Sequence, residues 1–198
     1  MTIAIYLAHL NPVTNAHSEI IKDLTKSDEV VVMPVRFLID GNEVNSKSFP
    51  FTFELRKQML ESVFGDSITV SSNYTFHAPF KKYFPPIVSK GSWRLRKEIL
   101  SEIEGKYYTY TGDKAEGIML KLYRLKPKIG QRKELSATSV KNEMYESVSG
   151  GKKEWEKQVP EQVAEIINKN WDIVEKFASS EDNTTRVLGM KFPREGYT

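Results

Sequence analysis

Two short apolar, β-branched segments separated by one amphipathic segment constrain the fold more than any other feature of this sequence. Residues 2–8 and 29–35 suit buried strands, and residues 18–26 between them carry apolar side chains at helical spacing. A second helix is expected over residues 51–65 and a third strand over residues 68–74. Strands and helices alternating at this spacing predict a parallel sheet with crossover helices. We therefore expect an α/β fold, a Rossmann-like doubly wound sheet followed by C-terminal helices.

The remainder of the chain is less regular. Prolines and aromatic residues over residues 77–91 indicate a long ordered loop. Further elements are expected as a helix over 93–105, a strand over 106–113, a helix over 115–125 that could break into a strand, a helix over 136–151 and one long amphipathic helix from Pro160 to Phe177. We expect one α/β domain over residues 1–178 and an irregular tail over residues 179–198, in which the segment VLGMKF could pair at a sheet edge.

Composition excludes several classes of function. The 198 residues include 29 basic and 26 acidic side chains, a mixed balance that argues against a dedicated nucleic-acid binder. The absence of cysteine excludes disulfides, a thiolate nucleophile and a zinc–thiolate site. The first apolar run is too short for a secretory core or a membrane span. We expect a cytoplasmic protein that binds neither nucleic acid nor membrane.

The stretch NPVTNAH, residues 11–17, leaves the first expected strand and enters the first expected helix. Thr14 and His17 then lie at the start of that helix, where free backbone N–H groups and the helix dipole favour an anion. Three positions apart, they can offer a hydroxyl and an imidazole N–H on one side. On local pattern alone the simpler alternative is favoured: Thr14 or Asn15 caps the helix and His17 faces water.

A second stretch, LSATSVK over residues 135–141, repeats this chemistry. Ser136 and Thr138 fall at an expected helix start and Lys141 follows one turn later, so the three could hold a further set of phosphate oxygens. Ser and Thr begin many helices for capping reasons only, so this stretch is weak evidence when taken by itself.

Together the two stretches resemble the signatures of the nucleotidylyltransferase superfamily, a [T/H]-x-G-H turn after strand 1 and a later I-S-S-T-x-x-R/K helix start. The resemblance is greatest to the phosphopantetheine adenylyltransferase branch. Four ordered segments carry it: NPVTNAH, the pair Ser46–Lys47 before FTFELR, SATSVK, and Gly150–Gly151 before VPEQV. They cover roughly the first third of the chain and the last third before the tail.

This resemblance implies a reaction and its partners. Such enzymes transfer a nucleoside monophosphate from a nucleoside triphosphate to a phosphorylated small molecule and release pyrophosphate. The resemblance implies that AMP is transferred from ATP and that the acceptor is phosphopantetheine or a nicotinamide or nicotinate mononucleotide. It also implies a role in coenzyme biosynthesis. Mg²⁺ is implied with ATP, held by phosphates and water without a carboxylate cage. The resemblance is compatible with a homo-oligomer but fixes no number of subunits.

The resemblance also implies roles for individual residues. His17, Thr14 and Lys47 would be catalytic, and Lys47 and Arg56 would hold the acceptor. The nucleotide-binding positions would be His9, Leu10, Asn11, His17, Gly112, Asp113, Ser136, Thr138 and Lys141.

The sequence departs from the family pattern at three places. Ala16 replaces the glycine of the helix start, and its methyl group would crowd a backbone that approaches phosphate. Ala8, His9 and Leu10 replace a glycine-rich lead-in. The segment TYTGDK lacks the arginine-rich element of the phosphopantetheine branch and is more similar to nicotinamide mononucleotide adenylyltransferases. Two alternatives therefore stay open: a cytidylyltransferase acting on a small phosphorylated alcohol, and a non-catalytic nucleotide-binding or regulatory protein of the same fold.

Overall fold

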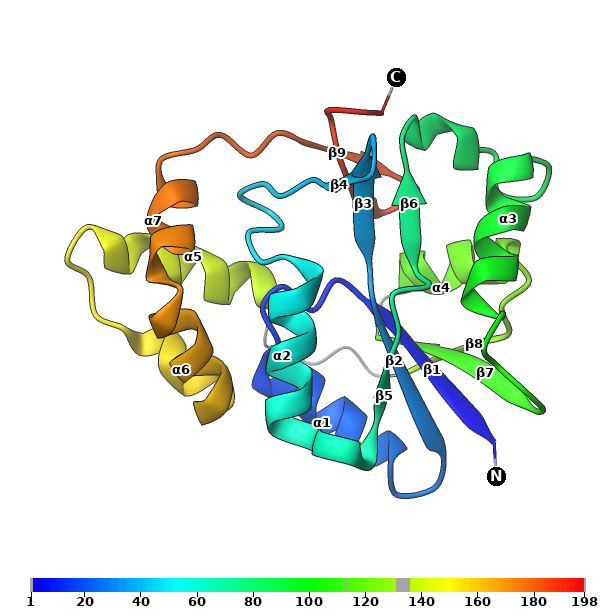
Figure 1. Cartoon of the computed structure of the whole chain (residues 1–198), viewed down its shortest axis with the longest axis horizontal. Coiled ribbons are helices and arrows are strands. Elements are labelled where there is room, and N and C mark those ends of the chain that lie inside the picture. Colours follow the sequence, from blue (N-terminus) through cyan, green and yellow to red (C-terminus); the bar gives the residue numbers. More distant parts are fainter. Residues whose placement is uncertain (1, 113, 131–135, 198) are drawn as a thin grey trace.

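A parallel sheet forms the centre of the computed structural model, which describes residues 2–112, 114–130 and 136–197. Within these residues the sheet has five strands in the order β5-β2-β1-β7-β8, and every pairing is parallel (Figure 1). The strands are β1 (Ile3–Ala8), β2 (Glu29–Pro34), β5 (Thr69–Val70), β7 (Tyr107–Thr111) and β8 (Pro127–Ile129). The expected Rossmann-like α/β fold is confirmed.

Alternation along β1 explains why helices cover both faces of this sheet. Ala4 and Tyr6 belong to one buried cluster, whereas Ile5 and Leu7 belong to another, because successive strand residues point to opposite faces. The first cluster packs against α1 (Asn15–Leu24), α2 (Phe53–Phe64), α5 (Ala137–Val148), α6 (Glu161–Lys169), α7 (Trp171–Ala178) and the 3-10 helix η3 (Glu154–Gln158). The second packs against α3 (Lys90–Ile99), α4 (Lys114–Leu122) and the 3-10 helix η2 (Phe80–Tyr83). No helix in the described ranges has the length and apolar character needed to cross a membrane.

A second, smaller sheet corrects the third expected strand. Only Thr69–Val70 pair in the central sheet, and a short 3-10 helix η1 (Gly65–Ser67) precedes them. The Thr75 hydroxyl donates to the Ser72 carbonyl at 2.6 Å, which turns the chain out of the sheet. It continues as β6 (Thr75–His77), beside β3 (Arg36–Ile39) and β4 (Asn42–Glu43). A single strand over residues 68–74 is therefore wrong, whereas the strand expected over residues 29–35 is present and leads into β3.

The long helix expected after Pro160 is two helices. The Asn170 side chain donates to the Ile166 carbonyl at 2.8 Å, and the Asn170 backbone N–H bonds to Ile167 instead of continuing the helical pattern. A side chain that competes for a backbone carbonyl in this way interrupts the helix. The break between α6 and α7 lets the Trp171 ring stack on buried Trp155, with ring centroids 5.8 Å apart.

The irregular tail expected over residues 179–198 contains a β-hairpin, which corrects that expectation for residues 184–193. Strands β9 (Thr184–Val187) and β10 (Met190–Pro193) pair antiparallel around a two-residue turn. Leu188 and Gly189 both have positive φ, as a type I′ hairpin turn requires. Buried Phe192 joins the second cluster and anchors the hairpin beside the small sheet.

Arg56 on α2 fastens the ends of the two central strands together. Its Nη1 donates to the carbonyls of His9 and Val35, each at 2.8 Å, and its Nη2 lies 3.0 Å from a Glu43 oxygen. The Glu43 carboxylate also accepts from the Phe53 backbone N–H at the start of α2. With 2% of its surface exposed, Arg56 is a buried structural cation.

Replacing Arg56 with methionine should lower the free energy of unfolding by about 3 kcal/mol, because the change leaves the partly buried Glu43 carboxylate and two backbone carbonyls without their partner. Denaturant unfolding followed by circular dichroism measures the loss. The matched control is Lys57→Met, one residue along the helix at an exposed ion pair with Glu61, where we expect less than about 1 kcal/mol. Equal losses in both variants would contradict the structural role of Arg56.

Candidate functional site

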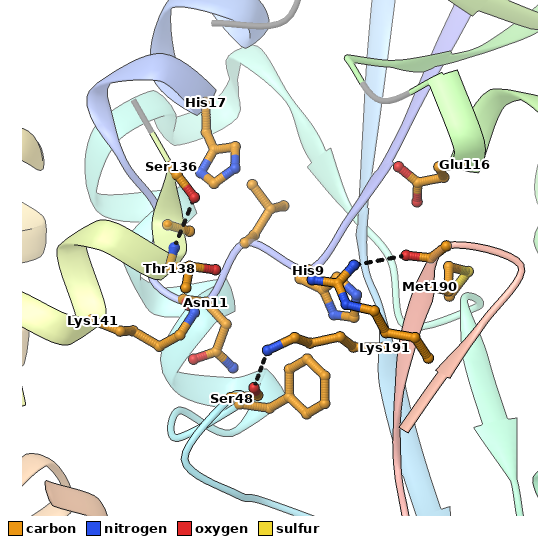
Figure 2. Close-up of a pocket in the computed structure, with 15 residues that line it drawn as sticks. His9, Asn11, His17, Ser48, Glu116, Ser136, Thr138, Lys141, Met190 and Lys191 are labelled. Atoms are coloured by element: carbon orange, nitrogen blue, oxygen red, sulfur yellow. Dashed lines mark hydrogen bonds between the residues drawn. The ribbon is translucent and has the colours of Figure 1, made fainter. Parts of the chain in front are cut away.

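A cavity of about 290 Å³ opens where the first strand ends. From β1 the chain crosses to β2 on one side, whereas β7 lies on the other side, so the cavity occupies the switch point of the sheet. Its lining comes from the β1–α1 loop, the starts of α1, α4 and α5, the loop before α2, and the hairpin (Figure 2). The residues are His9, Leu10, Asn11, His17, Ser48, Phe49, Glu116, Ser136, Ala137, Thr138, Lys141, Arg186, Gly189, Met190 and Lys191.

The first turn of α1 fixes which nitrogen of His17 carries its proton. The Thr14 side chain accepts from the His17 backbone N–H, and His17 Nδ1 accepts from the Thr14 backbone N–H at 3.1 Å, which forms a capping box. Because Nδ1 accepts, the neutral ring carries its proton on Nε2. Desolvation, helped by the Lys141 cation, lowers the pKa of His17 to about 4. His17 is therefore a neutral hydrogen-bond donor at the cavity at physiological pH.

A second helix start faces the same cavity. Ser136 caps α5, and its hydroxyl accepts from the Thr138 backbone N–H at 3.2 Å. Figure 2 shows Ser136 and Thr138 beside His17, so the N-termini of α1 and α5 converge. Two helix N-termini that meet in this way favour a multiply charged anion between them.

Lys141, one turn into α5, supplies a cation whose charge depends on pH near neutrality. The side chain is 7% exposed, and Nζ donates to the Asn11 carbonyl at 2.8 Å. The pKa of Lys141 is lowered to about 7, mainly by burial and to a smaller extent by the neighbouring Lys191 cation. The Asp182 carboxylate opposes this shift. A bound anion restores the favourable surroundings that the ammonium lacks, so anion binding and protonation of Lys141 reinforce each other.

Aromatic and amide groups form the base of the cavity. The His9 ring stacks on Phe49 with ring centroids 4.8 Å apart. The pKa of His9 is lowered to about 3, mainly because the ring is buried. Its Nδ1 has no hydrogen-bond partner within the described residues. The Asn11 carboxamide bonds both backbone groups of Phe51, so its role here is to hold the β1–α1 loop in place.

The hairpin contributes residues that we did not expect from the sequence. Arg186 and Lys191 place two cations at the cavity, and Gly189 and Met190 complete this wall. Ser48, Phe49 and Glu116 were also missed. The signal for the hairpin was present in RVLGMK, two alternating segments around a Leu-Gly pair, but nothing local indicated that it faces the first helix.

Several expected site residues lie elsewhere in the described structure. Thr14 is buried and acts on the His17 ring, without lining the cavity itself. Lys47 Nζ donates to the Ala178 carbonyl at 2.7 Å and lies over the Tyr145 ring, away from the cavity lining. Arg56 is buried and bonds the carbonyls of His9 and Val35.

Gly112, Asp113 and Ala16 do not belong to the described cavity lining either. Gly112 follows β7 but is not among the described lining residues, and Asp113 lies outside the described residues. Ala16 is buried in α1, and its methyl group is not part of the described lining either. The crowding expected from Ala16 is therefore not seen at the cavity wall formed by these residues.

The donor set decides what this cavity can bind. Among the described lining residues, nitrogen donors and cations outnumber carboxylates, of which Glu116 is the one present, and it accepts from the Thr111 hydroxyl at 2.6 Å. No group of three or more metal-ligating side chains forms among the described residues. The arrangement suits a multivalent anion such as a phosphate chain.

Comparison with known proteins gives a fold relationship. No protein-family model matches this sequence, and no curated protein matches it either. A bifunctional NMN adenylyltransferase/ADP ribose pyrophosphatase from Francisella tularensis superposes over 90% of this chain with a TM-score of 0.65 and 18% identity. The structure of that protein in complex with AMP and a manganese ion superposes with a TM-score of 0.62 and 14% sequence identity. This chain spans 52% of the length of that protein.

A second relationship covers a whole neighbouring chain. The nicotinic acid mononucleotide adenylyltransferase from Plasmodium falciparum, complexed with NaAD, superposes over 89% of this chain and 98% of its own with a TM-score of 0.53 and 13% identity. At such low identities these similarities establish a shared fold.

Anion binding should weaken as the pH rises through about 7, because Lys141 loses its proton there. Below this pH Lys141 is already protonated in the free protein. Above this pH Lys141 must take up a proton when the anion binds, which lowers the apparent affinity. Calorimetry measures the affinity for inorganic tripolyphosphate as a function of pH in the wild type and in Lys141→Met. Because the variant lacks the titrating group, it reports the pH dependence that comes from the ligand itself. The ratio of wild-type to variant affinity should fall about tenfold between pH 6 and pH 8. A constant ratio would show that Lys141 does not titrate with binding.

Proposed function

We propose that this protein transfers AMP from ATP to a phosphorylated acceptor, a nicotinate or nicotinamide mononucleotide, with release of pyrophosphate. The observation that carries the proposal is the convergence of two helix N-termini, the His17 Nε2–H and Lys141 on one cavity at the switch point of the sheet. That set of donors suits the triphosphate of ATP. The superfamily resemblance of the two stretches that build it supports the same reaction.

The reaction asks the protein for alignment and charge stabilisation. The phosphate of the acceptor attacks the α-phosphorus of ATP, the bond from that phosphorus to the bridging oxygen breaks, and pyrophosphate leaves with the bonding electrons. His17 donates its Nε2 proton as a hydrogen bond to oxygens that gain charge in the transition state. Ser136, Thr138 and Lys141 hold the β- and γ-phosphates. No covalent intermediate with the protein is required.

A divalent ion fits this site as part of the nucleotide. The lining offers nitrogen donors and cations with Glu116 as its carboxylate, a set that suits phosphate oxygens better than a bare metal ion. Mg²⁺ bound to ATP would neutralise phosphate charge, held by the phosphates and water, with Ser136 and Thr138 positioning those phosphates.

Two considerations support the mononucleotide as acceptor. The solved structures that share the fold are named as NMN or nicotinic acid mononucleotide adenylyltransferases, and the manganese ion and AMP belong to one of those complexes. In addition, TYTGDK replaces the arginine-rich element of the phosphopantetheine branch. Phosphopantetheine therefore remains the comparison substrate.

Pyrophosphate release tests this proposal. We expect turnover that requires both ATP with Mg²⁺ and a nicotinate or nicotinamide mononucleotide, with one dinucleotide formed for each pyrophosphate. Parallel reactions replace ATP with CTP and the mononucleotide with phosphopantetheine or a small phosphorylated alcohol. Binding of ATP without turnover for any pair would contradict the enzyme proposal and favour a non-catalytic nucleotide-binding protein.

His17→Ala should lower kcat by about 100-fold or more, the effect of losing a donor that acts in the transition state, with a smaller change in the KM for ATP. Steady-state kinetics with the preferred substrate pair give both constants. His77→Ala is the matched control, because His77 is an exposed histidine on β6 that does not line the cavity among the described residues. Retained activity in His17→Ala would show that the imidazole is not the essential donor.

A further inference from the structure

Two cations face each other directly across the hairpin. Arg186 on β9 and Lys191 on β10 are register partners, so both side chains stand on the same face of the ribbon. Like charges in directly opposite positions destabilise an antiparallel pair. This face lines the cavity opposite the α1 and α5 helix starts (Figure 2). An anion between the two side chains would remove the repulsion.

Only one of the two cations is neutralised by a carboxylate among the described residues. Lys191 Nζ donates to the Ser48 hydroxyl at 2.8 Å and lies 3.2 Å from an Asp182 oxygen, which also accepts from Ser48 at 2.8 Å. These bonds hold the ammonium in place at the wall. Arg186, by contrast, bonds the Gly189 carbonyl of its own turn at 3.3 Å, which leaves most of its guanidinium donors for a ligand.

The residues that the family resemblance assigns to the acceptor are committed elsewhere. Lys47 is bonded to the carbonyl end of α7, and its own carbonyl accepts from the Tyr145 hydroxyl at 2.7 Å. The Arg56 guanidinium donates its hydrogen bonds to backbone carbonyls and to Glu43. A phosphate of the acceptor therefore needs a different cationic partner at this cavity.

We propose that Arg186 and Lys191 of the hairpin form the subsite for the phosphate monoester of the acceptor. The α1 and α5 starts bind the triphosphate, and the hairpin presents the acceptor phosphate from the opposite wall. A guanidinium can grip a phosphate with two parallel hydrogen bonds, and the ammonium adds a point charge. The identity of the anion rests on the proposed function, whereas the subsite itself rests on the hairpin geometry.

Kinetics of Arg186→Gln, Lys191→Gln and the double variant test this subsite. We expect the KM for the mononucleotide to rise at least tenfold in each single variant and further in the double variant, with the KM for ATP changed less than twofold. Arg194→Gln is the matched control, because Arg194 directly follows β10 and is exposed away from the described cavity lining. An increase confined to the KM for ATP, or no change in either KM, would overturn the proposal.

Calorimetry separates failure of the subsite from failure of the proposed reaction. Nicotinate mononucleotide should bind wild-type protein at least tenfold tighter than nicotinate riboside, which lacks the phosphate, and the double variant should lose this preference. This readout needs no turnover, so it applies even to a wild-type protein that is inactive in the pyrophosphate assay. Equal affinities for the two ligands in wild type, or a preference that survives in the double variant, would overturn the subsite.

Discussion

The Arg56 guanidinium is the interaction on which the candidate site depends. It binds the backbone just beyond the carboxyl ends of both β1 and β2, and through Glu43 it binds the start of α2. The backbone N–H of Val35 also donates to the Ala8 carbonyl at 2.9 Å, so Arg56 adds to a pairing that reaches the ends of both strands. The loops that follow such strand ends carry the ligand-binding groups in open parallel sheets. A buried cation that bonds carbonyls of both strand ends stabilises the geometry of the loop holding His9 and Asn11, so a residue outside the cavity determines its shape.

Positive charge and hydrogen-bond donors dominate the described lining of the cavity. Two helix dipoles, a neutral imidazole that donates through Nε2, and the cations Lys141, Arg186 and Lys191 converge on one space. Burying a cation and placing it beside another cation both cost stability in the empty protein. The pKa of Lys141 is lowered by burial and, to a smaller extent, by Lys191. Under the proposed function, the same charges would attract the phosphates of the nucleotide and the acceptor. The site is thus organised before the ligand arrives, at the expense of the unliganded state.

Local chemistry explains which features the sequence could predict. The alternation of strands and helices predicted the central sheet, and hydroxyl residues predicted the helix starts at Thr14 and Ser136, because capping and periodicity are encoded within a few residues. That His17, Ser136 and Lys141 share one cavity followed from the family resemblance of the two stretches, not from their local chemistry. The second sheet and the hairpin wall depend on contacts between distant segments, and no short pattern specifies those. Lys47 and Arg56 show the same limit: their loop and helix were anticipated, but which way a long cationic side chain points is decided by tertiary packing.

The capping box at α1 makes one pair of groups serve both helix initiation and chemistry. The backbone N–H of Thr14, the residue that caps the start of the helix, also donates to His17 Nδ1 and so keeps the His17 proton on Nε2. If the first turn frays, Nδ1 is released, the ring exchanges freely between tautomers, and the donor is lost while the rest of the sheet stays folded. The proposed donor role of His17 therefore depends on the first turn of α1 remaining folded.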